Sequence, residues 1–226
     1  MQGQRLRVGV LFGGRSAEHE VSIVSAQSVI AALDKKKYEV IPIGISKEGR
    51  WLAGDKVVTL LKSGARIPPA LAQMLPADPT VRSLVSLTPI KTGRLGKTPD
   101  VIIPVLHGTF GEDGTVQGLL ELAGIPYVGA GVLGSAVGMD KVAQKLIYQA
   151  HGILTPKFEY FTAGQFKSSS QYILRRIKKL GLPVFIKPVN QGSSVGISKV
   201  KQGSELKKAI QLALRYDRRV IVEKSV

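Results

Sequence analysis

A lysine and a loop of glycines and serines stand close together near the end of the chain. Lys187 follows the apolar residues 184–186, and the loop Gly192-Ser193-Ser194-Val195-Gly196 begins five residues later. Because glycine has no Cβ, such a loop can turn sharply and approach a ligand closely. Backbone N–H groups beside a lysine ammonium suit a polyphosphate. An ordinary β-hairpin with a glycine–serine turn is the alternative, and this stretch alone does not decide between the two.

A second group of reactive side chains follows an apolar run in the first half of the chain. Residues 100–106 predict a buried strand, and His107-Gly108 and Gly111-Glu112-Asp113-Gly114 come directly after it. Glycines mixed with titratable groups at the carboxyl end of a strand are typical of ligand sites in open α/β sheets. We expect Glu112 and Asp113 to shape this loop by accepting hydrogen bonds from backbone N–H groups.

The elements that position these residues can be predicted from their periodicity. Residues 5–12 and 38–45 read as strands, with a glycine turn at 13–14 and a helix between them, so a parallel sheet with a right-handed crossover is expected. Ser16 is predicted to cap that helix, with Glu18 and Glu20 in its first turn. Residues 46–54 suggest a hairpin, residues 55–98 give no functional signal, and residues 129–138 are expected to form a flexible junction. In the second half, helices are predicted at 140–150, 171–180 and 205–214, and strands at 157–161, 184–187, 198–200 and 219–226.

The composition narrows the class of protein. The chain has 226 residues, 44% of them hydrophobic, and no cysteine, which excludes disulfides and thiolate chemistry. Residues 1–15 do not read as a signal peptide, and residues 122–139 contain too many glycines for a membrane helix. The net charge is +16, of which +13 falls in residues 141–226. Such a positively charged second half indicates binding of nucleic acid, binding of a phosphate-rich ligand, or the absence of an acidic segment that would pair with it.

Four motifs together resemble the D-alanine–D-alanine ligases of the ATP-grasp superfamily. They are residues 13–22, residues 107–108 with 111–114, residues 187–188 with 192–196, and residues 222–224. The resemblance implies an α/β protein. A parallel-sheet, Rossmann-like N-terminal (pre-ATP-grasp) domain at 1–138 would precede the first half of an ATP-grasp module, the central ATP-binding subdomain, at 139–226.

The same resemblance implies a reaction. ATP would phosphorylate the carboxylate of one D-alanine, and the amine of a second would attack the acyl phosphate, giving the dipeptide used for peptidoglycan and the bacterial cell wall. The full-length protein would act in the cytoplasm on D-alanine and ATP, with Mg²⁺ or Mn²⁺, as a homodimer paired through its N-terminal domain.

The resemblance also assigns roles to individual residues. Glu18 and Ser193 are the candidate catalytic residues: Glu18 would hold the ammonium of the first D-alanine, and Ser193 would face the phosphates and help link Glu18 to a tyrosine on a later loop. Val21 and His107 would lie beside the same substrate. The residues implied to bind ATP are Lys141, Lys187, Gly192, Ser193, Ser194, Val195, Glu223, Lys224 and Val226. The structural alternatives are a helix-capping role for Glu18, a turn histidine at 107 and an exposed ion pair of Glu223 with Lys224.

Part of the family's chemistry has no counterpart in the sequence. Residues 141–226 contain only Glu159, Glu205, Asp217 and Glu223 as carboxylates, without the paired cluster that Mg²⁺ between phosphates needs. We therefore expect no metal ligand in this chain, and we interpret it as a ligase lacking its C-terminal part and poorly active alone.

Three other functions are weighed against this one. A ligase that joins D-alanine to D-lactate or D-serine would carry the same motifs, and an inactive relic that only dimerises would too. A basic nucleic-acid-binding protein is disfavoured because the basic helix at 172–180 holds a single aromatic residue, Tyr172, whereas single-strand binders interleave aromatic and basic residues. No nucleic-acid or membrane partner is expected.

Overall fold

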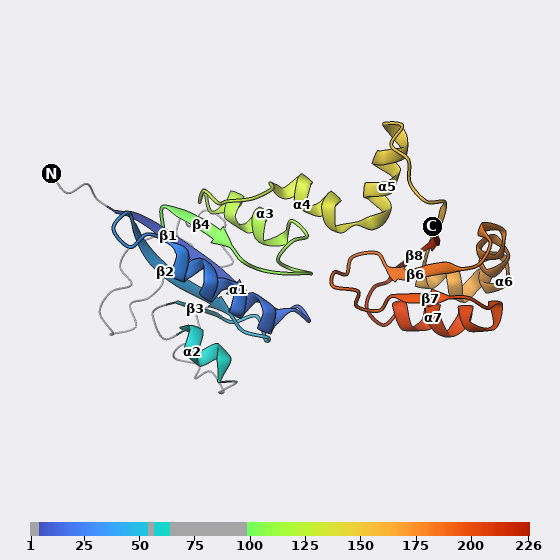
Figure 1. Ribbon diagram of the computed structural model, residues 1–226, viewed down its shortest axis with the longest axis horizontal. Coiled ribbons are helices and arrows are strands. Elements are labelled where there is room, and N and C mark those ends of the chain that lie inside the picture. The colour runs from blue at the N-terminus through green and yellow to red at the C-terminus, as the bar shows by residue number, and fades with distance from the viewer. Residues whose placement is uncertain (1–4, 54–56, 64–98) are drawn as a thin grey trace. The chain divides into compact units, whose positions relative to one another are not determined.

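The computed structural model describes residues 5–53, 57–63 and 99–226, and the chain divides into two compact units, Met1–Ser135 and Ala136–Val226. Figure 1 shows the order of the elements along the chain. Most of the segment 55–98, to which no function is assigned from its residues, lies outside the described residues.

The first unit is built on a sheet with the order β3-β2-β1-β4. Strand β1 (Leu6–Gly13) pairs in parallel with β2 (Tyr38–Ile45) and with β4 (Val101–Pro104), while the short β3 (Trp51–Ala53) runs antiparallel to β2. The helix α1 (His19–Ala32) connects β1 to β2, and α2 (Val57–Lys62) follows β3. The predicted parallel sheet and the predicted hairpin after β2 are both confirmed.

Both faces of β1 are buried, which explains its nearly continuous apolar sequence. Val8, Val10 and Phe12 pack in a core cluster with Ile23 of α1. Leu11, which points to the opposite face, packs with residues of α3 (Thr115–Leu122). The sheet is therefore the middle layer of its unit, and its carboxyl edge is the place where side chains can meet a ligand.

Two predicted features of the first unit are wrong. The helix α1 begins at His19 rather than just after Ser16, because Ser16 instead accepts the N–H of Glu18 at 3.1 Å in a turn before the helix. The expected flexible junction at 129–138 holds a helix, α4 (Val132–Met139), whose leucine, alanine and methionine favour a helix despite its two glycines. Ile102 of β4 forms an isolated parallel bridge with Tyr127.

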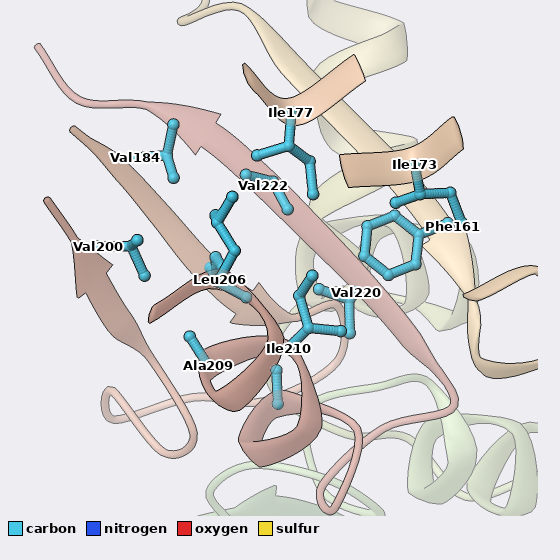
Figure 2. Packing of buried hydrophobic residues seen from close by; sticks show 12 residues of the cluster. Phe161, Ile173, Ile177, Val184, Val200, Leu206, Ala209, Ile210, Val220 and Val222 are labelled. Carbon is cyan, nitrogen blue, oxygen red and sulfur yellow. The ribbon is translucent and has the colours of Figure 1, made fainter. Parts of the chain in front are cut away.

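The second unit is built on an antiparallel sheet with the order β5-β8-β6-β7. Its strands are β5 (Phe158–Thr162), β6 (Val184–Pro188), β7 (Ser198–Val200) and β8 (Arg219–Lys224). Helices α6 (Ala163–Leu180) and α7 (Leu206–Ala213) contribute to one core cluster with these strands, and a 3₁₀ turn, η2 (Gly203–Glu205), leads into α7. Figure 2 shows this cluster, in which the two helices and the strands contribute Phe161, Ile173, Ile177, Val184, Leu206, Ile210, Val220 and Val222.

The alternation of side chains along β6 and β8 decides what lies on the other face of this sheet. Val220 and Val222 belong to the cluster under α6 and α7, whereas Ile221 packs with Val142 of α5 (Lys141–Ala150) in a separate cluster. Because successive strand residues point to opposite faces, Lys187 and Glu223 share the face of Ile221. The sheet thus carries its lysine and its carboxylate away from the helix-covered core.

Most elements of the second unit follow the prediction, with one clear difference. The helix α6 starts at Ala163, eight residues before the predicted start at 171, because Thr162 and Gln165 form a capping box. A non-helical residue, Ser169, interrupts it. The predicted basic helix at 171–180 is therefore only the second half of α6.

An ion pair at the amino edge of the first sheet is expected to stabilise the fold less at low pH than at neutral pH. The guanidinium of Arg7 on β1 donates to both carboxylate oxygens of Asp100, at 2.5 and 3.0 Å, and the Arg7 N–H donates to one of them at 2.8 Å. These hydrogen bonds lower the pKa of Asp100 to about 2.

A carboxyl whose pKa is lower in the folded state stabilises that state above its unfolded pKa, near 3.8, and loses this contribution as the pH falls towards 2. We expect D100N to be less stable than the native chain at pH 5, with the difference shrinking between pH 4 and pH 2. Thermal unfolding followed by circular dichroism across that range measures it. A difference in melting temperature that stays constant down to pH 2 would contradict this assignment.

Candidate functional site

A buried serine joins three segments at the carboxyl edge of the first sheet. The hydroxyl of Ser22 on α1 accepts the N–H of Gly13 at the end of β1, at 2.8 Å, and donates to the carbonyl of Val105 just after β4. Gly14, the residue after Gly13, donates its N–H to the Ile45 carbonyl at the end of β2, at 2.8 Å. The loops that follow β1, β2 and β4 are thus tied to one another. Ser22 had no predicted role, although it lies within the first motif.

The carboxylate of Glu18 lies against the backbone of Gly108. A Cβ built on Gly108 would come within 2.7 Å of Glu18 Oε2, and Gly108 has a φ of +72°, a conformation that favours glycine. The first and second motifs, ninety residues apart in sequence, therefore meet at this carboxylate. The alternative role for Glu18, helix capping, is not observed, because its side chain makes no cap hydrogen bond to α1.

His107 and Val21 lie on the same part of the first unit. His107 Nε2 is 3.3 Å from the hydroxyl of Ser25 on α1, and the imidazole is partly buried. Val21, one turn before Ser25 on α1, is 55% exposed.

The two acidic residues of the second motif shape its loop, as the sequence predicts. Glu112 accepts the Gly108 N–H at 2.7 Å. Asp113 accepts the N–H groups of Phe110 and Thr115, at 2.9 and 3.1 Å. Their oxygens are therefore used to hold the backbone beside Glu18.

In the second unit, a nearly buried carboxylate is shared by two lysines. Glu223, 8% exposed, accepts Lys187 Nζ at 2.6 Å on one oxygen and lies 3.4 Å from Lys145 Nζ through the other. Lys145 also stands 5.6 Å from the ring of Phe158. The alternative of an exposed ion pair between Glu223 and Lys224 is wrong, because Lys224 turns away and donates to the carbonyls of Gly181 and Leu182 at 3.0 and 3.1 Å.

A third lysine approaches the same face from α5. Lys141 Nζ donates to the carbonyl of Gln191 at 2.5 Å and to that of Val189 at 3.3 Å, at the base of the glycine-rich loop. Burial, followed by the positive charge of Lys187, lowers the pKa of Lys141. An anion placed between these ammonium groups would relieve their repulsion, which is the electrostatic condition for a phosphate site.

The glycine-rich loop is anchored at both ends and strained at its tip. At its start, the N–H and the side-chain amide of Asn190 donate to Asp217, at 2.7 and 3.0 Å. At its end, Gly196 packs so closely on Pro188 and Tyr216 that a Cβ would come within 2.8 and 2.6 Å of them. Between the anchors, Ser193 and Ser194 adopt positive φ values of 44° and 61° and are exposed.

Strained serines at an exposed tip are typical of loops that contact ligands.

The structure therefore collects the predicted residues into two groups, one in each unit. Glu18 lies with Gly108 in the first, and Lys141, Lys187 and Glu223 lie together in the second. Val226 ends the chain fully exposed. The expected link between Ser193 and Glu18 would join the two units and stays a prediction. Lys145 is the residue of the second group to which the sequence assigned no role.

No cluster of three potential metal-ligating side chains occurs among the residues that the structure describes. The carboxylates of the second unit hold basic or backbone groups: Glu159 pairs with Arg176, Asp217 holds Asn190, and Glu205 accepts the N–H groups of Lys201 and Gln202. The described residues therefore do not fit a Mg²⁺ site on their own.

Together the sheets and sites define an α/β protein with a ligand edge on a parallel sheet and a lysine-lined, glycine-rich loop on an antiparallel one. Known families confirm this class. The family profile described as "D-ala D-ala ligase N-terminus" matches residues 7–130, and that described as "D-ala D-ala ligase C-terminus" matches residues 147–226. The chain belongs to the D-alanine–D-alanine ligase family, and the fold is the expected N-terminal domain followed by part of an ATP-grasp module.

Individual relatives agree with this family. The chain is 48% identical over 224 residues to a D-alanine--D-alanine ligase of Natranaerobius thermophilus, covering 99% of this chain and 60% of that one. A counterpart from Mycobacterium sp. strain KMS is 45% identical over 232 residues, covering 100% and 62%.

Solved structures give the same result. The VanG D-Ala:D-Ser ligase of Enterococcus faecalis superposes with a TM-score of 0.78 at 35% identity, covering 99% of this chain and 63% of that one. The D-alanine-D-alanine ligase of Coxiella burnetii superposes with a TM-score of 0.78 at 34% identity, covering 99% of this chain and 62% of that one. The chain thus spans about three-fifths of the length of these relatives.

Proposed function

We propose that the protein represented by this chain joins two D-alanines into D-alanyl-D-alanine with ATP, for the synthesis of peptidoglycan precursors. The observation that carries the proposal is the set of lysines around the glycine-rich loop: Lys141 and Lys187 converge on one face of the second sheet, beside Glu223. The family supports the substrates, since the named relatives are D-alanine--D-alanine ligases.

In the proposed reaction, the γ-phosphoryl group passes from ATP to a carboxylate oxygen of the first D-alanine, giving ADP and D-alanyl phosphate. The amine of the second D-alanine then attacks the carbonyl carbon, the C–O bond to phosphate breaks, and inorganic phosphate leaves. Lys141 and Lys187 would hold the phosphates and offset their charge, while Glu18, fixed against Gly108, would hold the ammonium of the first D-alanine. Such catalysis depends on positioning and on preorganised charge.

Several finer features are part of the proposal. Ser193, Ser194 and Val195 would cover the phosphates, and Glu223, Lys224 and Val226 would meet the adenine largely through backbone groups. Mg²⁺ would offset the charge of the phosphates through ligands other than the carboxylates of the described residues. We place the protein in the cytoplasm as a homodimer that pairs through its first unit. None of the described helices is long and apolar enough to cross a membrane.

The nature of the second substrate is kept as a separate alternative. The similarity to the VanG D-Ala:D-Ser ligase, at 35% identity and a TM-score of 0.78, favours D-serine as the competing candidate. The same assay with D-alanine, D-serine or D-lactate as the second substrate distinguishes these activities by the mass of the product.

A chimera tests the proposal directly. Residues 1–226 would be joined to the remaining C-terminal part of the 48% identical relative, and the purified protein assayed for D-alanine-dependent release of phosphate and for the dipeptide by mass spectrometry. We expect dipeptide formation, reduced by at least about a hundredfold in the E18Q chimera because a neutral amide cannot pair with the ammonium.

A matched control and a contradicting outcome complete this test. The E20Q chimera changes an exposed acidic residue on α1, two positions after Glu18, and should keep its activity. The 226-residue chain alone should release little ADP. A folded chimera that binds ATP but forms neither a dipeptide from D-alanine or D-serine nor an ester from D-lactate would contradict the proposal.

A further inference from the structure

The two lysines on Glu223 are not equivalent, and their difference has a consequence for ligand binding. Lys187 Nζ lies 2.6 Å from one carboxylate oxygen, and Lys145 Nζ lies 3.4 Å from the other. Lys187 extends from β6 beside the glycine-rich loop, with its side chain 22% exposed, whereas the Lys145 side chain is 12% exposed and lies over Phe158. Lys187 is the more accessible lysine, and Lys145 faces the interior.

An anion that draws Lys187 towards it takes the nearest partner away from Glu223. The Glu223 side chain is 10% exposed, so water can replace that partner only in part. Leaving a buried carboxylate without its counter-ion is costly, and this cost would be subtracted from the affinity for the anion. Glu223 therefore needs a second cation that stays in place.

We propose that Lys145 is a positioning residue that serves as the reserve counter-ion of Glu223, so that Lys187 can move from Glu223 to a polyphosphate. This inference rests on the proposed function, because it assumes that Lys187 contacts the phosphates of ATP. Lys145 itself touches no ligand in this scheme. It keeps the carboxylate neutralised and fixed while Lys187 changes partners.

A packing role and a charge-neutralising role for Lys145 lead to different expected results. If Lys145 only fills space over Phe158, its loss acts equally whether or not residue 223 is charged. If it neutralises Glu223, its loss matters only while that carboxylate is present. A double-mutant cycle between the two positions measures this difference.

The probe is inorganic tripolyphosphate, which lacks the base and so avoids any contact of Glu223 with adenine. Its dissociation constant would be measured by amide NMR titration of the 226-residue chain. We expect K145M to weaken binding roughly tenfold and K145R to bind as the native chain does. The charge-matched control, K208M on the exposed face of α7, should stay within about twofold, since distant surface charges are screened. In an E223Q background, adding K145M should leave the constant unchanged.

Two results would overturn the inference while leaving the proposed function intact. One is a K145M variant that binds tripolyphosphate as tightly as K208M does. The other is a K145M effect of the same size with and without the Glu223 carboxylate. If neither ATP nor tripolyphosphate perturbs the spectrum of the native chain, Lys187 does not bind phosphates in this chain and the inference fails, while the chimera assay still decides the proposed function separately.

A measurement on the native chain covers the case in which K145M does not fold. Signals of the lysine ammonium groups, observed by ¹⁵N NMR at low temperature, report on each Nζ separately. On adding tripolyphosphate, we expect the Lys187 signal to move and the Lys145 signal to stay. Equal movement of both signals, or movement of Lys145 alone, would contradict the division of roles.

Discussion

Replacing Gly13 by alanine is expected to destabilise the first unit by ~3 kcal/mol, the largest stability change that we predict. Gly13 has a φ of +89°, and a Cβ there would lie 2.2 Å from the carbonyl oxygen of Ile45. That oxygen accepts the N–H of Gly14, so the clash also breaks the hydrogen bond that joins the loop after β1 to the end of β2. Backbone atoms cannot move aside as a flexible side chain can.

Urea denaturation followed by the fluorescence of Trp51 measures this effect. Trp51 is the single tryptophan of the chain and lies opposite Ile45 in the pairing of β2 with β3, so its signal reports on the affected region. The matched control is G118A, in α3 of the same unit, where a Cβ would meet nothing within 4 Å. Because alanine has a higher helix propensity than glycine, the free energy of unfolding of G118A should be higher than that of the native chain by roughly 0.5–1 kcal/mol. Equal stability of G13A and the native chain would contradict this interpretation of the turn.

The second large effect is expected on ATP binding. K187M should weaken the binding of ATP by about thirtyfold, or ~2 kcal/mol, because a charge-assisted contact to the phosphates is lost. Methionine keeps the apolar stem against Phe185, 5.7 Å from the native ammonium, and Lys145 still neutralises Glu223. The variant is therefore expected to fold, and its change in melting temperature should be small.

An NMR titration with ATP measures the dissociation constant, and K199M is the matched control. Lys199 lies on β7, is exposed, and its ammonium stands 5.3 Å from the same Phe185 ring. The K199M substitution therefore removes an equal charge and a similar ring contact. K199M should bind ATP within about twofold of the native chain, as expected for a screened surface charge. Comparable weakening in both variants would mean that overall charge, rather than the position of Lys187, governs binding.

Local patterns in the sequence determined most of the elements of this protein. The apolar run of β1 indicated a strand buried on both faces, and the glycines after it indicated a turn, because both signals depend on neighbouring residues only. The apolar residues 184–186 likewise indicated a strand that ends near Lys187, and in the observed strand β6 Val184 and Ile186 lie in the core while Lys187 lies on the other face. The loop-shaping role of Glu112 and Asp113 also followed from short-range spacing.

Local patterns failed where the backbone chose between competing local structures. Ser16 had the residue type of a helix cap, yet the two-glycine turn before it delays α1 to His19. Residues 129–138 had the glycine content of a loop, but α4 forms there, and the buried side chain of Met139 helps to fix it. The start of α1 was thus set by a local turn, whereas burial of Met139 supports α4 against the low helix propensity of its glycines.

The sequence by itself determined which residues lie on which face, and the tertiary structure decided which of them meet. Glu223 and Lys187, thirty-six residues apart, are neighbours because of the register in which β6 pairs with β8, and Lys145 joins them only because α5 packs Val142 against Ile221. Likewise, Glu18 meets Gly108 only where the loops after β1 and β4 converge. Side-chain parity follows from the chain's own periodicity, whereas register and helix docking depend on contacts between distant segments.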